Sequence, residues 1–368
     1  MHNSLRPSGY YETTQEWARK TLDDATFSKR YVPFPYAPTV FRSPPKSVES
    51  KLHPVFEWCM NTKPGPQFIA AIPMGRVAGR SGGVISPDNK LLWDVSIESE
   101  GPEKHSVFTD PLPGQKMYVP GNVAVLTSYA SHNYYHWLYD VIARIYLLRR
   151  SGIPIHKYIL NGAGEQPFQS ETLAALGIAP KQRIVCRPNV SIQAENLIVS
   201  SMPGFSGHPP KWACHFIKSA LQTMRRVPTL PGFERLYISR AHARYRKVKN
   251  EPQLIGLLAK YGFRMIQLER LSVYDQAKLF SSAQVIVSPH GAGLANLTFC
   301  RPGTKVLEIY SPKYVNPLYY VLSNQMELDY SYVIGQGYVP GEHAHMIMDD
   351  ITVDLSHVQQ MLANMLRG

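Results

Sequence analysis

The stretch that decides the fold of the second half of the chain is Gln284-Val285-Ile286-Val287-Ser288-Pro289-His290-Gly291-Ala292-Gly293-Leu294-Ala295-Asn296-Leu297. The β-branched run before the proline predicts a buried strand, and the apolar spacing from Leu294 predicts a helix. Between them, Gly291 and Gly293 have no Cβ, so a ligand can approach the backbone closely. The first amides of a helix lack partners and carry its positive end, which suits a phosphate. A turn that binds nothing needs the same glycines, so the loop alone leaves both interpretations open.

Strands and helices alternate on both sides of this stretch. We predict strands at 235–239, 263–268, 284–287 and 305–310, separated by helices at about 251–261 and 273–281. Such a series folds into a doubly wound parallel sheet, which binds ligands at the carboxyl ends of its strands. The residues after Ser239, Val287 and Ile309 are therefore candidates for a site.

The first half of the chain has a β-rich start at about 66–127. Short strands and helices then alternate to residue 225, which predicts a second α/β sheet that is parallel in this part. Two prolines and a glycine in 226–232 mark a boundary. We divide the chain into an irregular N-terminal arm (1–60), an α/β domain with the β-rich start (61–228), a second α/β domain (229–345) and a closing C-terminal amphipathic helix (346–368).

Composition limits the class of protein. The 368 residues are 44% hydrophobic and 18% charged, as expected for two folded domains rather than a disordered chain. Lys and Arg exceed Asp and Glu by 39 − 27 = 12, which favours anionic partners. The four cysteines are scattered, so we expect buried, reduced thiols. No run of about 18 apolar residues and no signal peptide occur, which predicts a soluble, cytoplasmic protein.

A first cluster of side chains that could take part in catalysis lies on a predicted helix that begins near Asn133. His136, Asp140 and Arg144 are spaced at i, i+4 and i+8, so they form one polar stripe on an otherwise apolar helix. A carboxylate beside an imidazole is typical of general-base chemistry. A structural ion pair between Asp140 and Arg144, with His136 as a core histidine, is the alternative. Zinc binding by His132 and His136 is disfavoured, because no glutamate follows the first histidine.

A second cluster directly follows the strand at 235–239. Arg240 and Arg246 are placed to clamp a diphosphate, and Asn250 is expected to cap the next helix. A solvated basic loop and a nucleic-acid contact remain alternatives. Downstream, Glu308 sits inside an apolar strand and needs hydrogen-bond donors, which ribose hydroxyls, backbone amides or an arginine can supply.

Taken together, these motifs resemble glycosyltransferase family 61. The residues that carry the resemblance are Asn133-Tyr134-Tyr135-His136-Trp137-Leu138-Tyr139-Asp140, Ser239-Arg240, Arg246, Asn250-Glu251, Gly262-Phe263, Gln276, His290-Gly291-Ala292-Gly293-Leu294-Ala295-Asn296 and Glu308. They span about residues 122–310, and their order makes the resemblance more specific than the glycine loop alone.

The resemblance implies an α/β protein of the GT-B class, with two Rossmann-like domains facing across a cleft. It also implies inverting transfer of a sugar from a nucleotide-sugar donor to a glycan acceptor, in synthesis of a capsular or other cell-surface polysaccharide or glycoconjugate. On the motif positions, Asp140 and His136 are the candidate catalytic residues of the acceptor-side domain (61–228), where His132, Asn133 and Tyr134 face the acceptor. The donor domain (229–345) would bind the nucleotide diphosphate through Arg240, Arg246, His290, Gly291, Ala292, Gly293, Asn296 and Glu308.

We expect no metal cofactor, although Mn²⁺ or Mg²⁺ is not ruled out by the sequence. No compact Asp-x-Asp motif occurs, and Asp23-Asp24 and Asp349-Asp350 lie far from the predicted site. Nucleic acid is not an expected partner, whereas the basic charge allows peripheral association with the inner face of a membrane. The alternative function is that of a non-catalytic α/β protein that binds nucleotides or RNA.

Overall fold

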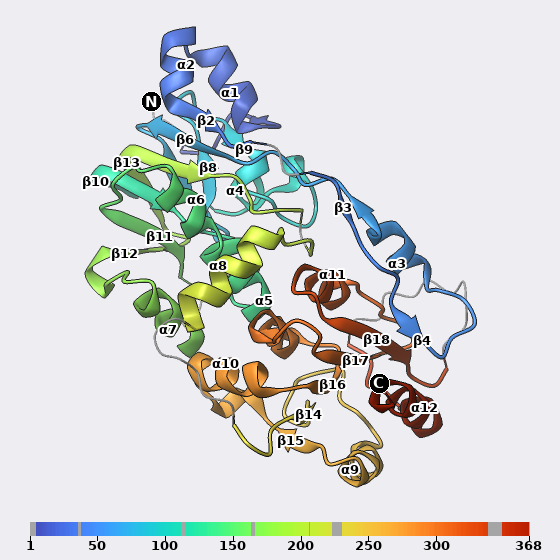
Figure 1. Cartoon of the computed structure of the whole chain (residues 1–368). Coiled ribbons are helices and arrows are strands. Elements are labelled where there is room, and N and C mark those ends of the chain that lie inside the picture. Colours follow the sequence, from blue (N-terminus) through green and yellow to red (C-terminus); the bar gives the residue numbers. More distant parts are fainter. Residues whose placement is uncertain are drawn as a thin grey trace. The chain divides into compact units, whose positions relative to one another are not determined.

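The computed structural model describes residues 5–35, 38–111, 115–162, 166–205, 207–222, 230–337 and 348–367. The chain forms two compact units (Figure 1). Unit 1 comprises residues 1–37 and 65–205, and unit 2 comprises residues 38–64 and 206–368. The predicted arm is thus shared between the units. The boundaries predicted at 228–229 and 345–346 lie outside the described residues.

Unit 1 is built on a mixed sheet. Its strands are β1 (Tyr10–Tyr11), β2 (Tyr31–Pro33), β6 (Phe68–Pro73), β7 (Arg76–Ala78), β8 (Gly83–Ile85), β9 (Leu91–Leu92), β10 (Gln115–Val125), β11 (Lys157–Asn161), β12 (Arg183–Cys186) and β13 (Val190–Ser200). The order is β1-β9-β8-β7-β13-β10-β11-β12, with β6 paired to β13 and β2. Strands β13, β10, β11 and β12 are parallel, whereas β6, β7 and β8 pair antiparallel. The predicted β-rich start and the parallel part that follows it are both confirmed.

The helices of unit 1 are α1 (Thr14–Thr21), α2 (Asp24–Arg30), α4 (Ser106–Thr109), α5 (Tyr134–His136), α6 (Arg144–Arg150) and α7 (Pro167–Ala175), with 3-10 turns η1 (Trp93–Val95), η2 (Pro102–Lys104) and η4 (Pro180–Gln182). Trp17 and Ala18 of α1 are buried in the same core as β6, β10 and β13. Residues 14–31 are therefore a packed part of unit 1.

The helix predicted from Asn133 is interrupted. Between α5 and α6, residues Trp137–Ile142 form the π-helix η3, where the amide of Ala143 donates to the carbonyl of Leu138, five residues earlier. Such a turn holds an extra residue and is frequent at functional sites. It therefore breaks the i, i+4, i+8 spacing that an uninterrupted α-helix would give to the polar stripe.

Unit 2 is built on a parallel sheet. Its strands are β14 (Arg235–Ile238), β15 (Arg264–Ile266), β16 (Val285–Pro289), β17 (Lys305–Tyr310), β18 (Asp329–Ile334) and β4 (Lys46–Ser47), in the order β15-β14-β16-β17-β18-β4. A small pair, β3 (Val40–Phe41) and β5 (Asn61–Thr62), lies apart from it. The four strands predicted in this half are confirmed, with ends that differ by at most two residues. Because β15 and β16 flank β14, the strand order reverses between β14 and β16, where open α/β sheets bind ligands.

Helices cover both faces of this sheet (Figure 1). They are α3 (Pro54–Cys59), α8 (Lys211–Gln222), α9 (Glu251–Lys260), α10 (Val273–Ser282), α11 (Leu318–Gln325) and α12 (Leu355–Leu366), with the 3-10 turn η5 (Leu268–Arg270) and the 3-10 helix η6 (Ala292–Phe299). Helices α9 and α12 share one apolar core with β14, β16 and β17. Helices α8, α10 and α11 pack around η6.

Helix η6 corrects the α-helix predicted after the glycine loop. The amide of Leu294 donates to the carbonyl of Gly291, and Cys300 donates to Leu297, both three residues earlier. Residues 294–299 are all buried, and three helices surround them. The conformation of this segment is therefore set by packing on every side and not by an amphipathic α-helical period.

All four cysteines are buried and none is in a disulfide, as expected. Within the described ranges, no helix has the length and apolarity needed to span a lipid bilayer.

Candidate functional site

The strand reversal in unit 2 brings two predicted motifs together. Arg240 lies two residues after β14, and His290 directly follows the neighbouring strand β16. A Cβ built on Gly291 would overlap Nη1 of Arg240, so the arginine lies directly over the glycine backbone. Glycine is needed here for close approach and not for its dihedrals, because its φ of 177° is extended. The structure therefore places the basic loop against the glycine loop.

Arg240 and Arg246 are held by backbone carbonyls. Nη2 of Arg240 donates to the carbonyl of Tyr245 at 2.9 Å, and its Nε donates to that of Arg246 at 3.3 Å. Nε of Arg246 donates to the carbonyl of His290 at 3.3 Å. Burial, and then the charge of Arg246, lowers the pKa of Arg240. Two cations held side by side, with lowered pKa for one of them, make a site that favours an anion.

The glycine loop adds backbone donors to these cations. Among the described residues, the amides of Gly291, Ala292 and Gly293 make no hydrogen bond. Behind the loop, Nδ2 of Asn296 donates to Oε1 of Gln276 at 2.7 Å and to the carbonyl of Gly293 at 2.9 Å. Asn296 is fully buried, so in this structure it holds the loop in place.

Glu308 lies behind the same loop. Its partners are side chains of the protein, namely His290, Tyr310 and Tyr330, and the carboxylate is fully buried. Asn250 also differs from the expectation, because its side chain bonds the backbone of Val353 and not the start of α9. This contact joins the start of α9 to the chain that leads into α12.

The catalytic candidates lie in unit 1. Nδ1 of His136 and Oδ2 of Asp140 are 2.7 Å apart, with 26% and 14% of their side chains exposed. The carboxylate therefore fixes the orientation of the imidazole, and both groups stay accessible to a substrate.

The contacts of Arg144 differ from the alternative in which it forms an ion pair with Asp140. Its Nε donates to Oγ of Ser200 at 3.0 Å, and its Nη1 donates to the carbonyl of Thr127 at 2.8 Å. The described residues contain no ion pair between Asp140 and Arg144, because the π-turn displaces the arginine from the stripe and carries it inward. Arg144 is fully buried, which lowers its pKa to about 10, while the charge of Asp140 opposes the decrease.

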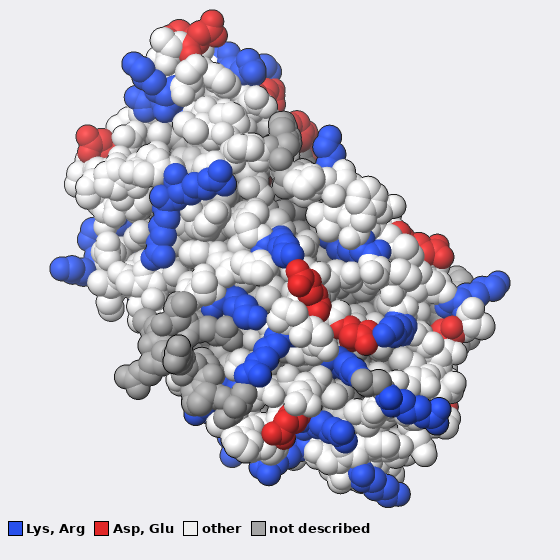
Figure 2. All heavy atoms as spheres, in the orientation of Figure 1, with Lys and Arg blue, Asp and Glu red and all other residues white. Residues whose placement is uncertain are grey.

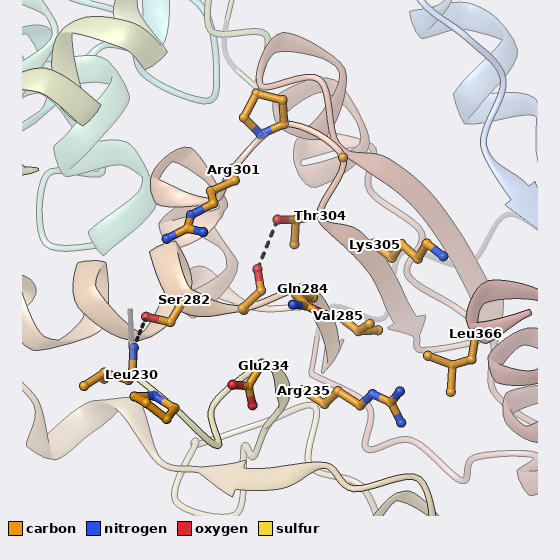
Figure 3. Close-up of a pocket in the computed structure, with 14 residues that line it drawn as sticks. Leu230, Glu234, Arg235, Ser282, Gln284, Val285, Arg301, Thr304, Lys305 and Leu366 are labelled. Atoms are coloured by element: carbon orange, nitrogen blue, oxygen red, sulfur yellow. Dashed lines mark hydrogen bonds between the residues drawn. The ribbon is translucent and has the colours of Figure 1, made fainter. Parts of the chain in front are cut away.

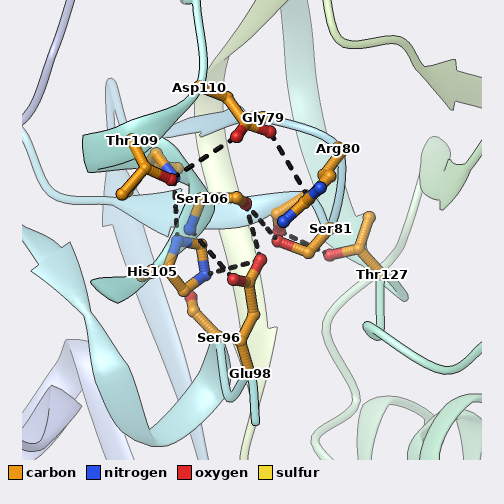
Figure 4. A network of polar contacts seen from close by, with 12 residues as sticks. Gly79, Arg80, Ser81, Ser96, Glu98, His105, Ser106, Thr109, Asp110 and Thr127 are labelled. Carbon is orange, nitrogen blue, oxygen red and sulfur yellow. Dashed lines mark hydrogen bonds and ion pairs between the residues drawn. The ribbon is translucent and has the colours of Figure 1, made fainter. Parts of the chain in front are cut away.

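Thr127 connects Arg144 to a buried polar network in unit 1 (Figure 4). Oγ1 of Thr127 donates to the carbonyl of Gly82, whose neighbour Ser81 lies 3.3 Å from Oγ of Ser106. Ser106 donates from both its hydroxyl and its amide to Glu98, at 2.6 and 2.9 Å. The residue whose carbonyl accepts from Arg144 is thus itself bonded to this network.

The three predicted acceptor-side residues have different surroundings. His132 is exposed. Oδ1 of Asn133 accepts from the amide of Tyr135 at 2.9 Å and so caps α5. Tyr134 packs edge-on against Phe168 of α7, with ring centroids 5.2 Å apart. No group of three or more His, Cys, Asp or Glu side chains able to hold a metal occurs in the described part of the chain.

A cavity of about 590 Å³ lies elsewhere in unit 2 (Figure 3). Glu234, Arg235, Gln284 and Lys305, which line it, mark the amino ends of β14, β16 and β17. Ligands of parallel sheets bind at the opposite, carboxyl ends, so this cavity is a weaker candidate than the loop around Gly291.

Tyr310, Tyr330 and the polar network around Glu98 were not singled out from the sequence. A tyrosine in an apolar strand is usual in a core, and only the pairing of β17 with β18 brings Tyr330 to Glu308. The spacing Glu308-x-Tyr310, which puts both side chains on one face of β17, was the only local signal.

Comparison with known proteins relates the central part of the chain to one family. Residues 134–307 match the family described as Glycosyltransferase 61. The Beta-1,2-xylosyltransferase RCN11 of Oryza sativa subsp. japonica is 32% identical over 88 residues, 24% of this chain and 15% of the relative. The EGF domain-specific O-linked N-acetylglucosamine transferase of Drosophila melanogaster is 29% identical over 92 residues, 23% of this chain and 18% of the relative.

A longer similarity is found to the Protein O-linked-mannose beta-1,4-N-acetylglucosaminyltransferase 2 of Bos taurus. The two are 27% identical over 196 residues, which is 48% of this chain and 32% of the relative. Each of these similarities thus spans a third of the relative or less. The segment that matches the family contains Asp140, Arg240 and His290.

Proposed function

We propose, from the match of residues 134–307 to glycosyltransferase family 61, that this protein is a glycosyltransferase that uses a nucleotide-sugar donor. The observation that carries the proposal is the meeting of Arg240, Arg246 and the Gly291 loop at the strand reversal of a parallel sheet. Cations and free amides at this position suit a diphosphate. They would bind the donor and stabilise the charge that grows on the leaving diphosphate.

In this proposal, Asp140 or His136 removes the proton of the acceptor hydroxyl. The hydroxyl oxygen then attacks the anomeric carbon, and the bond from that carbon to the diphosphate breaks with its electron pair on the phosphate oxygen. Direct displacement inverts the anomeric configuration, which NMR of the product can establish. We also propose that the two α/β units make up a GT-B enzyme, to be tested by an experimental structure with bound nucleotide.

The donor is tested first. The names of the relatives specify transfer of xylose and N-acetylglucosamine, so UDP-xylose and UDP-N-acetylglucosamine are the first compounds to examine. A bound donor raises the unfolding temperature by mass action, and release of UDP then measures turnover. If none of a wider panel of nucleotide sugars stabilises the protein or is turned over, the proposal is wrong.

We further propose that Arg240 and Arg246, rather than a divalent cation, balance the charge of the diphosphate. Turnover is then expected to continue after treatment with EDTA. Restoration of a lost activity by Mn²⁺ or Mg²⁺ would show instead that a metal does this work.

The acceptor is proposed to be a glycan or glycoconjugate of the cell surface, such as a capsular polysaccharide, assembled in the cytoplasm or at the inner face of the membrane. Disruption of the gene should then remove the polymer or shorten it. A cell surface with unchanged glycans would contradict this part of the proposal.

The competing function is non-catalytic binding of nucleotides or RNA. On the face drawn in Figure 2, Lys and Arg side chains are interspersed with uncharged and acidic residues. A protein that binds the phosphate backbone of RNA usually has its basic residues clustered on one face. Transfer or hydrolysis of a nucleotide sugar would decide in favour of the enzyme, and tight binding without turnover would decide against it.

A further inference from the structure

Glu308 is the most completely enclosed carboxylate at the candidate donor site. It lies on the central strand β17 and has no exposed surface. Oε1 is 2.5 Å from Nδ1 of His290, while Oε2 is 2.5 Å from the hydroxyl of Tyr330 and 2.9 Å from that of Tyr310. Burial raises the pKa of both tyrosines, so they stay protonated and can donate. The carboxylate thus has protein hydrogen-bond partners at both oxygens.

The contact with Glu308 fixes the orientation of the His290 ring. Because Nδ1 points to the carboxylate, Nε2 is on the opposite edge of the imidazole, and it makes no hydrogen bond to any residue that the structure describes. The ring stacks on Tyr310, with centroids 5.4 Å and planes 27° apart. Tyr314 and Tyr319 pack against it at 5.4 and 5.1 Å. The imidazole is therefore packed against three tyrosine rings and bonded to Glu308 at Nδ1.

The charges around His290 oppose one another. Burial lowers the pKa of His290, Glu308 acts in the other direction, and Arg246 and Arg240 add to the decrease. The tyrosines that pack on the ring, Tyr310, Tyr314 and Tyr319, carry no charge while protonated. An anion bound by the two arginines would cancel their repulsion and leave the attraction of Glu308. The protonation of His290 is therefore expected to depend on whether the anion is present.

We propose that Glu308 is a positioning residue for His290, and that the pair takes up a proton when a nucleoside diphosphate binds. This inference rests on the proposed function, because it takes the arginines and the Gly291 loop as the diphosphate site. In the free protein, Nδ1–H donates to Glu308 and Nε2 holds a lone pair. On binding, Nε2 gains a proton from solvent and donates it in a hydrogen bond to a phosphate oxygen. The imidazolium then offsets one negative charge of the diphosphate.

Calorimetry in buffers of different ionisation enthalpy tests this directly. UDP, and also GDP and ADP, are titrated near neutral pH, and the slope of the measured enthalpy against the buffer enthalpy gives the number of protons taken up. We expect net uptake, approaching one proton at a pH between the pKa of free His290 and its higher pKa in the complex. His290→Gln should abolish the uptake and weaken binding roughly 10- to 100-fold, the loss of one charge-assisted hydrogen bond.

Glu308→Gln separates positioning from mere stability. The amide oxygen can still accept from Nδ1, although the NH2 group then faces the tyrosine hydroxyls, which must accept from it. The amide carries no charge to favour the imidazolium, so proton uptake should fall while the nucleotide still binds. If Glu308→Gln does not fold, Tyr330→Phe keeps the carboxylate and should retain the uptake. Arg244→Ala, on the exposed part of the basic loop, is the control and should behave as the wild type.

The outcomes distinguish this inference from the function on which it rests. Binding of a nucleoside diphosphate without proton uptake, or uptake that persists in His290→Gln, would overturn the inference alone. Failure of UDP, GDP and ADP to bind at all would overturn the proposed donor site, and this inference with it.

Discussion

At the residue scale, the 2.7 Å bond between His136 and Asp140 sets two residues in competition for one role. The carboxylate of Asp140 can take the proton of the acceptor hydroxyl directly, so we favour Asp140 as the base. The imidazole of His136 would then position either this carboxylate or the acceptor. Asp140→Asn should lower turnover by ~10²–10⁴-fold, the usual cost of losing a general base, and His136→Gln should lower it less. The assay is steady-state kcat, with nucleotide affinity as the control for folding. Reversed effects would exchange the roles, and wild-type turnover in both variants would make the pair structural.

The two arginines Arg240 and Arg244 follow the same strand but differ in their surroundings. Arg240 is half-buried over Gly291 and bonded to the loop carbonyls, whereas Arg244 is exposed. Arg240→Ala should weaken binding of a nucleoside diphosphate by ~1.5–3 kcal/mol, because it removes a charge-assisted contact. Arg244→Ala should change it by less than about 0.5 kcal/mol. Equal losses in the two variants, measured by calorimetry, would point to a diffuse electrostatic effect and not to a built site.

At the scale of elements, the local sequence predicted strands and connections but not helix types or partners. The β-branched run 285–287 is buried on both faces, as parallel central strands require, so its pattern was sufficient. The π-turn η3 and the 3-10 helix η6 depend on packing by segments distant in sequence, so their period is not encoded locally. The sequence alone showed that a buried Glu308 requires hydrogen-bond donors. That Tyr330 is one of these donors follows from the pairing of β17 with β18, which the local sequence does not show.

The loop between β16 and η6 gives a prediction at the same scale. Gly291→Ala would put a methyl group into the space of the Arg240 guanidinium and push it away from the loop, so affinity for a nucleoside diphosphate should fall at least about tenfold. Gly256→Ala is the matched control, because nothing lies within 4 Å of its added Cβ in α9. It should leave affinity unchanged and add about 0.5–1 kcal/mol to stability. Normal binding by Gly291→Ala would show that the ligand does not need Arg240 in this position.

At the scale of the whole chain, the segment that matches the family does not begin and end where the two folded units do. Residues 134–307 include β11, β12 and β13 but lack β10, which lies between β13 and β11 in the sheet. They also lack β18, β4 and α12 of unit 2. The shared sequence therefore covers candidate residues of both units, such as Asp140, Arg240 and His290, but not Glu308 and neither core in full.

The isolated segment 134–307 is consequently predicted not to fold as a domain. Without β10, the strands β11 and β13 would each expose an unpaired edge, and without α12 the apolar face of β17 would be open to water. Differential scanning calorimetry should show no cooperative transition for the segment and a clear one for the full chain. A transition with an enthalpy near ~0.7 kcal/mol per residue would instead show that the segment folds independently, since that is the usual value for a native domain near 60 °C. In that case the flanking strands would be additions to a smaller core, and Asp140→Asn and Arg240→Ala could be compared within the segment itself.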